Sequence, residues 1–227
     1  SSATILSLGS LLSERSPQTA RELRDRVIKE RPEEAAEAHY QLAKIDFAAG
    51  QDGSGIKHLR TGIDLDPEAL PLRYALAQTY EAAGSTDAAL GEYLDILKID
   101  TANTALMNHI GEIYFLKGRM DEARARFEDA HRLQPADPFS SQWLATDAER
   151  QGDWGKAADR LQLSSALAED PGLALRLSYY QTQAGRLKAA VAVLEAAQAR
   201  WPANDQIAYF LALGYDDLKD HDKAVKT

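Results

Sequence analysis

The sequence predicts an all-α fold, a solenoid in which antiparallel helix–turn–helix units stack side by side. Three columns of residues that recur with one common period lead to this prediction. The glycine column has steps of 34, 34, 34 and 33 residues and consists of Gly50, Gly84, Gly118, Gly152 and Gly185. A column of large aliphatic residues shows the same period and consists of Leu42, Leu76, Ile110, Leu144, Leu177 and Leu211. A third, small-residue column consists of Gly55, Ala89, Ala123, Ala157, Ala190 and Ala224.

One unit, residues 104–137, shows how the pattern gives two helices. The apolar residues of its first half fall at helical spacing and are Leu106, Ile110, Ile113 and Tyr114. Gly118 can adopt a left-handed backbone that ends this helix, and Asp121 is placed to cap the next one. Phe127 lies on the apolar stripe of that second helix, and Pro135 cannot continue it. The unit therefore reads as a helix, a tight turn and an antiparallel helix.

The period divides most of the chain into similar units. Their predicted ranges are 36–69, 70–103, 104–137, 138–170, 171–204 and an incomplete 205–227. Ala224 stands where the second helix of the last unit should begin, so we expect the chain to be a fragment of a longer protein. The open end of an unfinished unit could also stack on another copy of the chain.

Residues 1–35 match the pattern more weakly. Their matching positions, with one extra residue, are Leu8, Leu12, Ala20, Leu23, Val27 and Pro32. Ser16 and Pro17 would form the turn, since proline suits the first turn of a helix. This segment is predicted to be a degenerate first repeat, with an irregular N-terminal helical cap as the alternative.

The pattern of residue sizes resembles the tetratricopeptide repeat (TPR) family. The third unit carries the resemblance best, with Ile110, Gly111, Tyr114, Gly118, Ala123, Phe127, Ala130 and Pro135. Other units depart from the signature at single positions, as with Thr101 in place of proline, Ala148 and Gln181 in place of tyrosine, and Ile96 in place of a small residue. The resemblance implies a right-handed superhelix whose concave groove is lined by the first helix of each repeat.

The composition limits the classes of function. The 227 residues carry 26 Lys and Arg against 35 Asp and Glu, a net charge of -9, which disfavours nucleic acid and anionic membranes as partners. Without cysteine, disulfides and thiolate chemistry are excluded. The five histidines lack the spacing of a metal-binding helix; they are His39, His58, His109, His131 and His221. We therefore expect no enzyme activity, no cofactor and no membrane-spanning segment.

The resemblance also implies which side chains face the groove, namely the fifth, ninth and twelfth positions of each repeat. From these columns the predicted partner-binding residues are Tyr40, Lys44, Phe47, Tyr74, Gln78, Asn108, Glu112, Phe115 and Gln142. The same columns continue with Glu81, Thr146, Glu149, Leu175, Tyr179, Thr182, Tyr209, Leu213 and Asp216. Aromatic rings could offer an apolar face to a peptide or helix, and amides could bond its backbone. The alternative is that these aromatics only pack between repeats, as we expect of Trp154 and Trp201.

One known mode of TPR binding does not fit these columns. A clamp for a C-terminal carboxylate needs several cationic and amide side chains, but Glu112 would repel a carboxylate and only Lys44 could hold it. The resemblance thus implies a non-catalytic protein–protein scaffold with a peptide or helix in its groove, in bacteria often for envelope assembly, secretion, pilus biogenesis or exopolysaccharide export. The alternative is a regulatory or substrate-recruiting arm of a larger enzyme, such as a glycosyltransferase or kinase. The compartment and the partner stay open.

Overall fold

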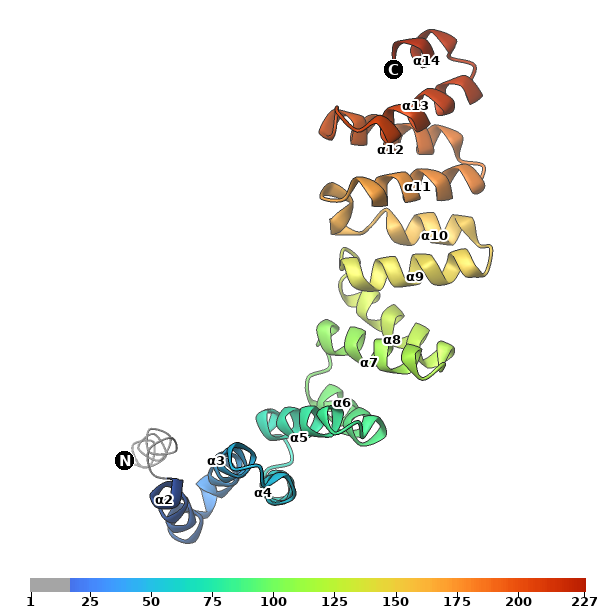
Figure 1. Cartoon of the computed structure of the whole chain (residues 1–227). Helices are drawn as coiled ribbons and strands as arrows, with labels where there is room; N and C mark the ends of the chain where they lie inside the picture. The colour runs from blue at the N-terminus through green and yellow to red at the C-terminus, as the bar shows by residue number, and fades with distance from the viewer. Residues whose placement is uncertain (1–16) are drawn as a thin grey trace. The chain divides into compact units, whose positions relative to one another are not determined.

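The computed structural model describes residues 17–227, and within them every regular element is a helix (Figure 1). This confirms the all-α prediction. Leu8 and Leu12, on which part of the first-repeat prediction rests, lie outside the described residues. The chain divides into two compact units, residues 1–102 and 103–227. The repeat ranges within these units stay a prediction.

The described part of the first unit is a series of helices in which each packs against the next. The helices are α2 (Pro17–Glu30), a 3-10 turn (Pro32–Glu34), α3 (Ala35–Ala48), α4 (Asp52–Leu65), α5 (Leu70–Ala82) and α6 (Thr86–Ile99). Contacts run from α2 to α3, α4, α5 and α6 in order, which is the nearest-neighbour pattern of a solenoid.

The second unit continues in the same way. Its helices are α7 (Thr104–Leu116), α8 (Met120–Leu133), α9 (Pro138–Arg150), α10 (Trp154–Leu161), a 3-10 turn (Ser165–Ala168), α11 (Pro171–Gln183), α12 (Leu187–Arg200), α13 (Asp205–Asp217) and α14 (His221–Lys226). Each packs against its successor, and α11 also lies beside α13. Figure 1 shows α9 to α13 as successive rungs of this unit.

The turn inside each hairpin has a left-handed residue. At Gly118 the backbone has φ +73°, and the Arg119 N–H donates to the carbonyl of Tyr114. The other glycines with positive φ are Gly50, Gly84, Gly152 and Gly185. Only glycine adopts this conformation without steric cost, which explains the glycine column. The sixth turn has Lys219 in the same conformation, with φ +63°.

The start of α8 differs from the prediction. The helix begins at Met120, and Arg119 occupies the capping position without a side-chain hydrogen bond to the backbone. Asp121 lies within the first turn, where its carboxylate accepts a hydrogen bond from Arg124 at 2.8 Å. The prediction that Asp121 caps this helix was therefore wrong. Side-chain caps that accept a backbone N–H are instead Asn103, Asp137, Asp153, Asp170, Asn204 and Asp220.

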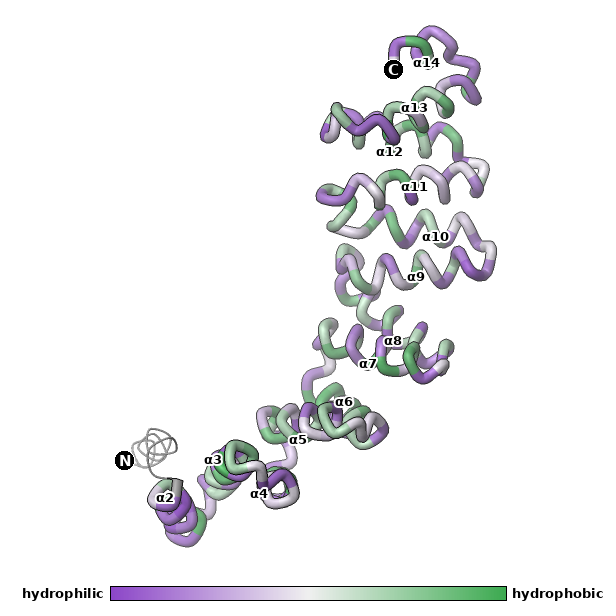
Figure 2. The backbone as a smooth tube through the Cα atoms, viewed as in Figure 1, coloured by the Kyte–Doolittle hydropathy of each residue, from purple (hydrophilic) through white to green (hydrophobic). Residues whose placement is uncertain are grey.

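Small residues let the two helices of a hairpin approach closely. A Cβ added at Gly111 would lie 2.8 Å from Cζ of Phe127, so the α7 backbone must be bare where that ring crosses it. Phe127 is completely buried. Figure 2 shows apolar segments on the paired helices of each hairpin, with hydrophilic segments at many turns. The hairpin core therefore depends on a large ring facing a glycine.

The second helix of the fourth predicted repeat is shorter than its equivalents. Helix α10 has eight residues, whereas α8 and α12 have 14. The chain leaves the helix near Ser164, whose backbone is extended, and the N–H of Ser165 donates to the carbonyl of Ala136. This is also the repeat whose period falls to 33 residues. The missing residue is thus accommodated by an early helix end and a 3-10 turn.

Candidate protein-interaction surfaces

The predicted groove residues of α3 are partly used for packing. The rings of Tyr40 and Phe47 are half-buried and pack against a core cluster that includes Leu59 and Leu76. Gly55 allows the Phe47 ring to lie over α4, since a Cβ there would come within 2.5 Å of it. Lys44 is exposed, with Nζ 5.7 Å from the centre of the Tyr40 ring. Only the outer edges of these rings and the lysine are accessible.

On α5, the two predicted residues differ in exposure. Tyr74 is half-buried, whereas Gln78 is exposed. One turn further on, Glu81 accepts a hydrogen bond from the hydroxyl of buried Tyr93 at 2.7 Å. The twelfth-position carboxylate of this repeat therefore joins α5 to α6.

Of the predicted residues on α7 and α9, only Glu112 is exposed, and the others are buried or packed against neighbours. Asn108 is buried and donates a hydrogen bond to Asp137, whereas Glu112 is exposed. Phe115 meets Trp143 edge-on with ring centres 6.0 Å apart. Gln142 is half-buried, and its backbone carbonyl accepts a hydrogen bond from Thr146 at 2.8 Å.

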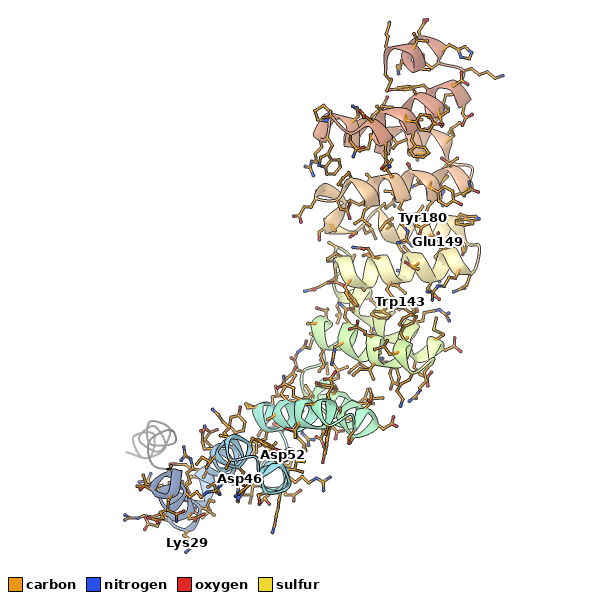
Figure 3. The ribbon with its side chains drawn as sticks, in the orientation of Figure 1. Lys29, Asp46, Asp52, Trp143, Glu149 and Tyr180 are labelled. Atoms are coloured by element: carbon orange, nitrogen blue, oxygen red, sulfur yellow. The ribbon has the colours of Figure 1, made fainter. Side chains whose placement is uncertain are left out.

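The column positions Thr146 and Glu149 are used between repeats rather than left open. The Tyr180 hydroxyl donates to Glu149, and the Arg176 guanidinium donates to Glu149 at 2.6 Å and to Thr146 at 2.8 Å. Figure 3 shows Glu149 of α9 and Tyr180 of α11 pointing toward one another. This network joins α9 to α11. It occupies the polar groups of Thr146 and Glu149, which the sequence columns predict to face the groove.

Tyrosine hydroxyls in such contacts should make the fold sensitive to alkali. Burial and then the hydrogen bond to Glu149 raise the pKa of Tyr180 above its ordinary value of about 10. The hydrogen bond to Glu195 and burial raise the pKa of Tyr215 to about 12. Because the folded-state pKa exceeds the unfolded one, this stability is fully present below about pH 10 and is lost as the pH rises through the folded-state value. We expect the urea midpoint of the second unit to fall as the pH rises from about 10 to about 12.

Variants separate this effect from general alkaline unfolding. Tyr180→Phe should cost about 1 kcal/mol at pH 8 through the lost hydrogen bond, but should lose less stability than the wild type on going to pH 11. Tyr180→Phe with Tyr215→Phe should flatten the pH dependence further. Equal slopes in the wild type and both variants would contradict the assignment.

An apolar groove lies between α11 and α13, with α12 as its floor. Each wall is a stripe at helical spacing: Leu175, Ser178, Tyr179 and Thr182 on α11, and Phe210, Leu213, Gly214 and Asp217 on α13. The floor consists of Leu187, Ala190, Val191 and Leu194. The groove has a volume of about 400 Å³, and Tyr179, Phe210 and Leu213 are 48%, 47% and 44% exposed. We call this surface the α11–α13 groove.

The sequence only partly anticipated this groove. Tyr179 and Leu213 stand in the predicted columns, but neither was selected as a binding residue, and Phe210 lies outside the columns. A usable signal was the adjacent aromatic pairs Tyr179–Tyr180 and Tyr209–Phe210, because neighbours on a helix cannot both face the core. In the structure Tyr180 is buried and Tyr179 is exposed, as this argument requires.

The tryptophans pack between helices. Trp143 stacks on Phe127 with ring centres 4.3 Å apart. Trp154 is partly buried and lies edge-on to Tyr179 at 5.7 Å. Trp201 is partly buried against the core formed by α12 and α13. These positions agree with packing as the role of Trp154 and Trp201.

Within residues 17–227, no group of three or more His, Asp or Glu side chains is arranged to hold a metal ion. None of the helices there combines the length and apolar character that crossing a bilayer needs. His39 and His58 lie with their Nδ1 atoms 2.9 Å apart, and burial, together with the neighbouring His58, lowers the pKa of His39.

Comparison with known sequences shows the family of the chain. The family described as "Tetratricopeptide repeat" matches residues 74–138 and 175–227, just over half of the chain. DnaJ homolog subfamily C member 3 of Homo sapiens is 27% identical over 101 residues, 44% of this chain and 20% of that protein, and the Bos taurus protein of that name gives the same values. The chain thus spans about a fifth of the length of these curated relatives.

Solved structures show the same arrangement of helices. A tetratricopeptide repeat protein from Parabacteroides merdae has a TM-score of 0.55 at 12% identity, over 98% of this chain and 89% of that one. The structure of MamA AMB-1 has a TM-score of 0.53 at 18% identity, over 74% of this chain and 92% of that one. At these identities the likeness is one of fold, and it confirms the predicted solenoid of helical hairpins.

Proposed function

Because the chain belongs to the tetratricopeptide repeat family, we propose that it is a non-catalytic scaffold that holds a peptide or helix of a partner protein. The family's fold is one that commonly binds proteins. The finer part of the proposal is where and what it binds. We propose that the first helix of each repeat contacts the partner, and the contact residues are considered separately for each of the two units.

The observation that carries the proposal is the α11–α13 groove. Three large apolar side chains, Tyr179, Phe210 and Leu213, stay about half exposed around an apolar floor. Contiguous exposed apolar surface of this kind is uncommon on monomeric proteins unless it meets a partner. Two parallel apolar walls suit one apolar stripe of an amphipathic helix, with side chains at i, i+3, i+4 and i+7. Asp217 at the wall favours a basic residue beside that stripe.

The other predicted residues lie outside the α11–α13 groove, on α3, α5, α7 and α9, and are considered within their own units. Lys44, Gln78 and Glu112 are exposed, and the rings of Tyr40, Tyr74 and Phe115 are half-buried, so each keeps an accessible edge. Phe47 contributes mainly to packing, and Gln142 lies half-buried beside Phe115's partner Trp143. These residues stay predictions as contacts, and they define the second surface to be tested.

Peptide selection tests the groove directly. Twelve-residue peptides displayed on phage would be selected on the immobilised chain, and the enriched ones synthesised and their affinity measured. We expect amphipathic sequences with basic residues. The double variant Tyr179→Ala with Leu213→Ala should weaken peptide binding at least about tenfold. A tenfold loss corresponds to about 1.4 kcal/mol of binding free energy, which is in the range expected when large interface side chains are removed.

A matched control is Leu133→Ala on α8, because Leu133 is also 44% exposed but lies outside the groove. It should leave the affinity unchanged. The variant Tyr40→Ala, Tyr74→Ala, Phe115→Ala asks the same question of the second surface. If folded variants of both surfaces kept full affinity for every selected peptide, the proposed function would be wrong.

The cellular role is proposed at a coarser level. We place the scaffold in bacterial envelope assembly, secretion, pilus biogenesis or exopolysaccharide export, supported by the cysteine-free, acidic composition. The competing role is a recruiting arm of a larger enzyme. The reading frame of the gene that encodes the chain distinguishes them: a glycosyltransferase or kinase domain on the same polypeptide would favour the arm.

A further inference from the structure

A second, polar cleft lies at the start of the second unit, between α7 and the α8–α9 connection. It has a volume of about 370 Å³ and is open to solvent on one side. The residues that line it are Thr104, Ala105, Asn108, His109, Glu112, Gln134, Asp137 and Phe139. Among the side chains that line it in the described structure there is no Lys or Arg. The cleft therefore has a negative electrostatic character in its own walls.

The amide of Asn108 fixes an unused acceptor at this cleft. The residue is only 9% exposed, and its Nδ2 donates to Oδ2 of Asp137 at 2.9 Å. An ionised carboxylate can only accept, so the amide cannot be turned the other way. Its Oδ1 is buried and receives no hydrogen bond from any described residue. A buried acceptor in this state costs about 1–3 kcal/mol unless a donor reaches it.

Asp137 supplies a fixed negative charge next to this acceptor. Burial alone would raise its pKa, but hydrogen bonds from the backbone N–H and hydroxyl of Ser140, and from Asn108, outweigh burial and lower the pKa. The N–H and hydroxyl of Ser140 lie 2.8 and 2.7 Å from Oδ2. Asp137 thus stays ionised at neutral pH and is held rigidly as the cap of α9.

The cleft also contains Glu112, Phe139 and the half-buried imidazole of His109. Glu112 is exposed on α7, one turn after Asn108, and adds a second carboxylate. Phe139 is 46% exposed and presents an aromatic ring. Thr104 does not offer its hydroxyl proton, because it donates to Gln134 at 2.8 Å. The walls therefore present two carboxylates, a buried acceptor and a ring, which together match a cationic donor.

We propose that this cleft binds a cationic side chain, an arginine or lysine, of the segment that the scaffold holds. The guanidinium or ammonium group lies between Glu112 and Asp137, donates to Oδ1 of Asn108 and packs its stem on Phe139. This inference rests on the proposed function and specifies the partner: a basic amphipathic segment, in agreement with the acidic charge of the chain. It also gives a physical reason why a carboxylate-ended peptide is rejected here.

The test uses small probes that carry only the relevant group. N-acetyl-arginine amide is titrated into the ¹⁵N-labelled chain, and N-acetyl-citrulline amide, of nearly the same shape without the charge, serves as the matched probe. We expect the NMR signals of the Asn108 side-chain amide and of the Phe139 backbone amide to shift as arginine is added, with a Kd of about 1–10 mM. Citrulline should bind at least about fivefold more weakly, and added salt should weaken arginine binding.

Two variants locate the effect. Glu112→Gln keeps shape and removes one carboxylate, and it should weaken arginine binding about threefold, as for a partly exposed ion pair. Glu169→Gln removes an exposed carboxylate that does not line the cleft and should change nothing. Equal binding of arginine and citrulline, or unchanged binding in Glu112→Gln, overturns the inference. Either result would leave a positive peptide selection on the α11–α13 groove valid, and with it the proposed function. If instead the selection failed and arginine still bound the cleft, the proposed scaffold function would be refuted and the cationic site would stand.

Discussion

Replacing Phe127 with alanine is expected to lower the free energy of unfolding of the second unit by about 3–5 kcal/mol. The ring is completely buried, covers the bare backbone of Gly111 and stacks on Trp143. The glycine opposite has no side chain that could fill part of the space. The loss therefore combines the transfer of a large apolar group to water with an unfilled cavity.

Urea unfolding followed by tryptophan emission measures this loss, since all three tryptophans lie in the second unit. Phe139→Ala is the matched control: its ring also lies near Phe127, with centres 5.9 Å apart, but is 46% exposed. It should cost about 1 kcal/mol or less. Similar losses for both variants would mean that the α7–α8 core does not depend on the buried ring.

Replacing Arg21 with methionine is expected to destabilise α2–α4 of the first unit by about 3 kcal/mol. Arg21 forms an ion pair with Asp46, whose carboxylate is completely buried. The imidazole of His58 is more distant from this carboxylate, with Nε2 3.7 Å from Oδ2 of Asp46. Removing one partner of such a pair leaves a buried charge without compensation, which costs more than the pair itself contributes.

Hydrogen exchange of the amides of α3 and α4 reports on this unit, which contains no tryptophan. A loss of about 3 kcal/mol corresponds to exchange about a hundredfold faster. Arg26→Met, on the same helix, breaks an exposed pair with Glu30 and should cost about 0.5 kcal/mol or less. Arg21→Met combined with Asp46→Leu should recover most of the stability. If the double variant were as unstable as Arg21→Met, the buried charge would not be the cause.

The repeat period could be predicted because its requirements are local. Gly118 and its equivalents stand at left-handed turns that other residues adopt only at a cost, so the sequence must show them. The position of Asp121 was less certain, because a capping residue and a first-turn residue differ by only two positions in the chain. The early end of α10 was not predicted, since it depends on a bond between Ser165 and the distant Ala136.

For the candidate sites, the sequence predicted only which positions of each repeat belong to the groove columns, and not which of those side chains stay accessible. The columns name Asn108 and Glu149 alike, but whether a polar side chain faces a partner or a neighbouring helix depends on tertiary contacts. Glu149 is occupied by Arg176 and Tyr180, whereas Asn108 uses its donor and keeps its acceptor. A cleft also needs neighbours from other helices, such as Asp137, which no column of α7 contains.

The left-handed Lys219 has a consequence for how the array comes apart. A side chain at this backbone conformation costs about 1 kcal/mol that glycine does not. Helix α14 contains no buried residue, so little packing energy opposes this cost. We therefore expect the α13–α14 hairpin of these 227 residues to open more easily than the hairpins whose turns have glycine, exposing Tyr215. Heating or limited proteolysis is then expected to act first on α14, a helix of six residues.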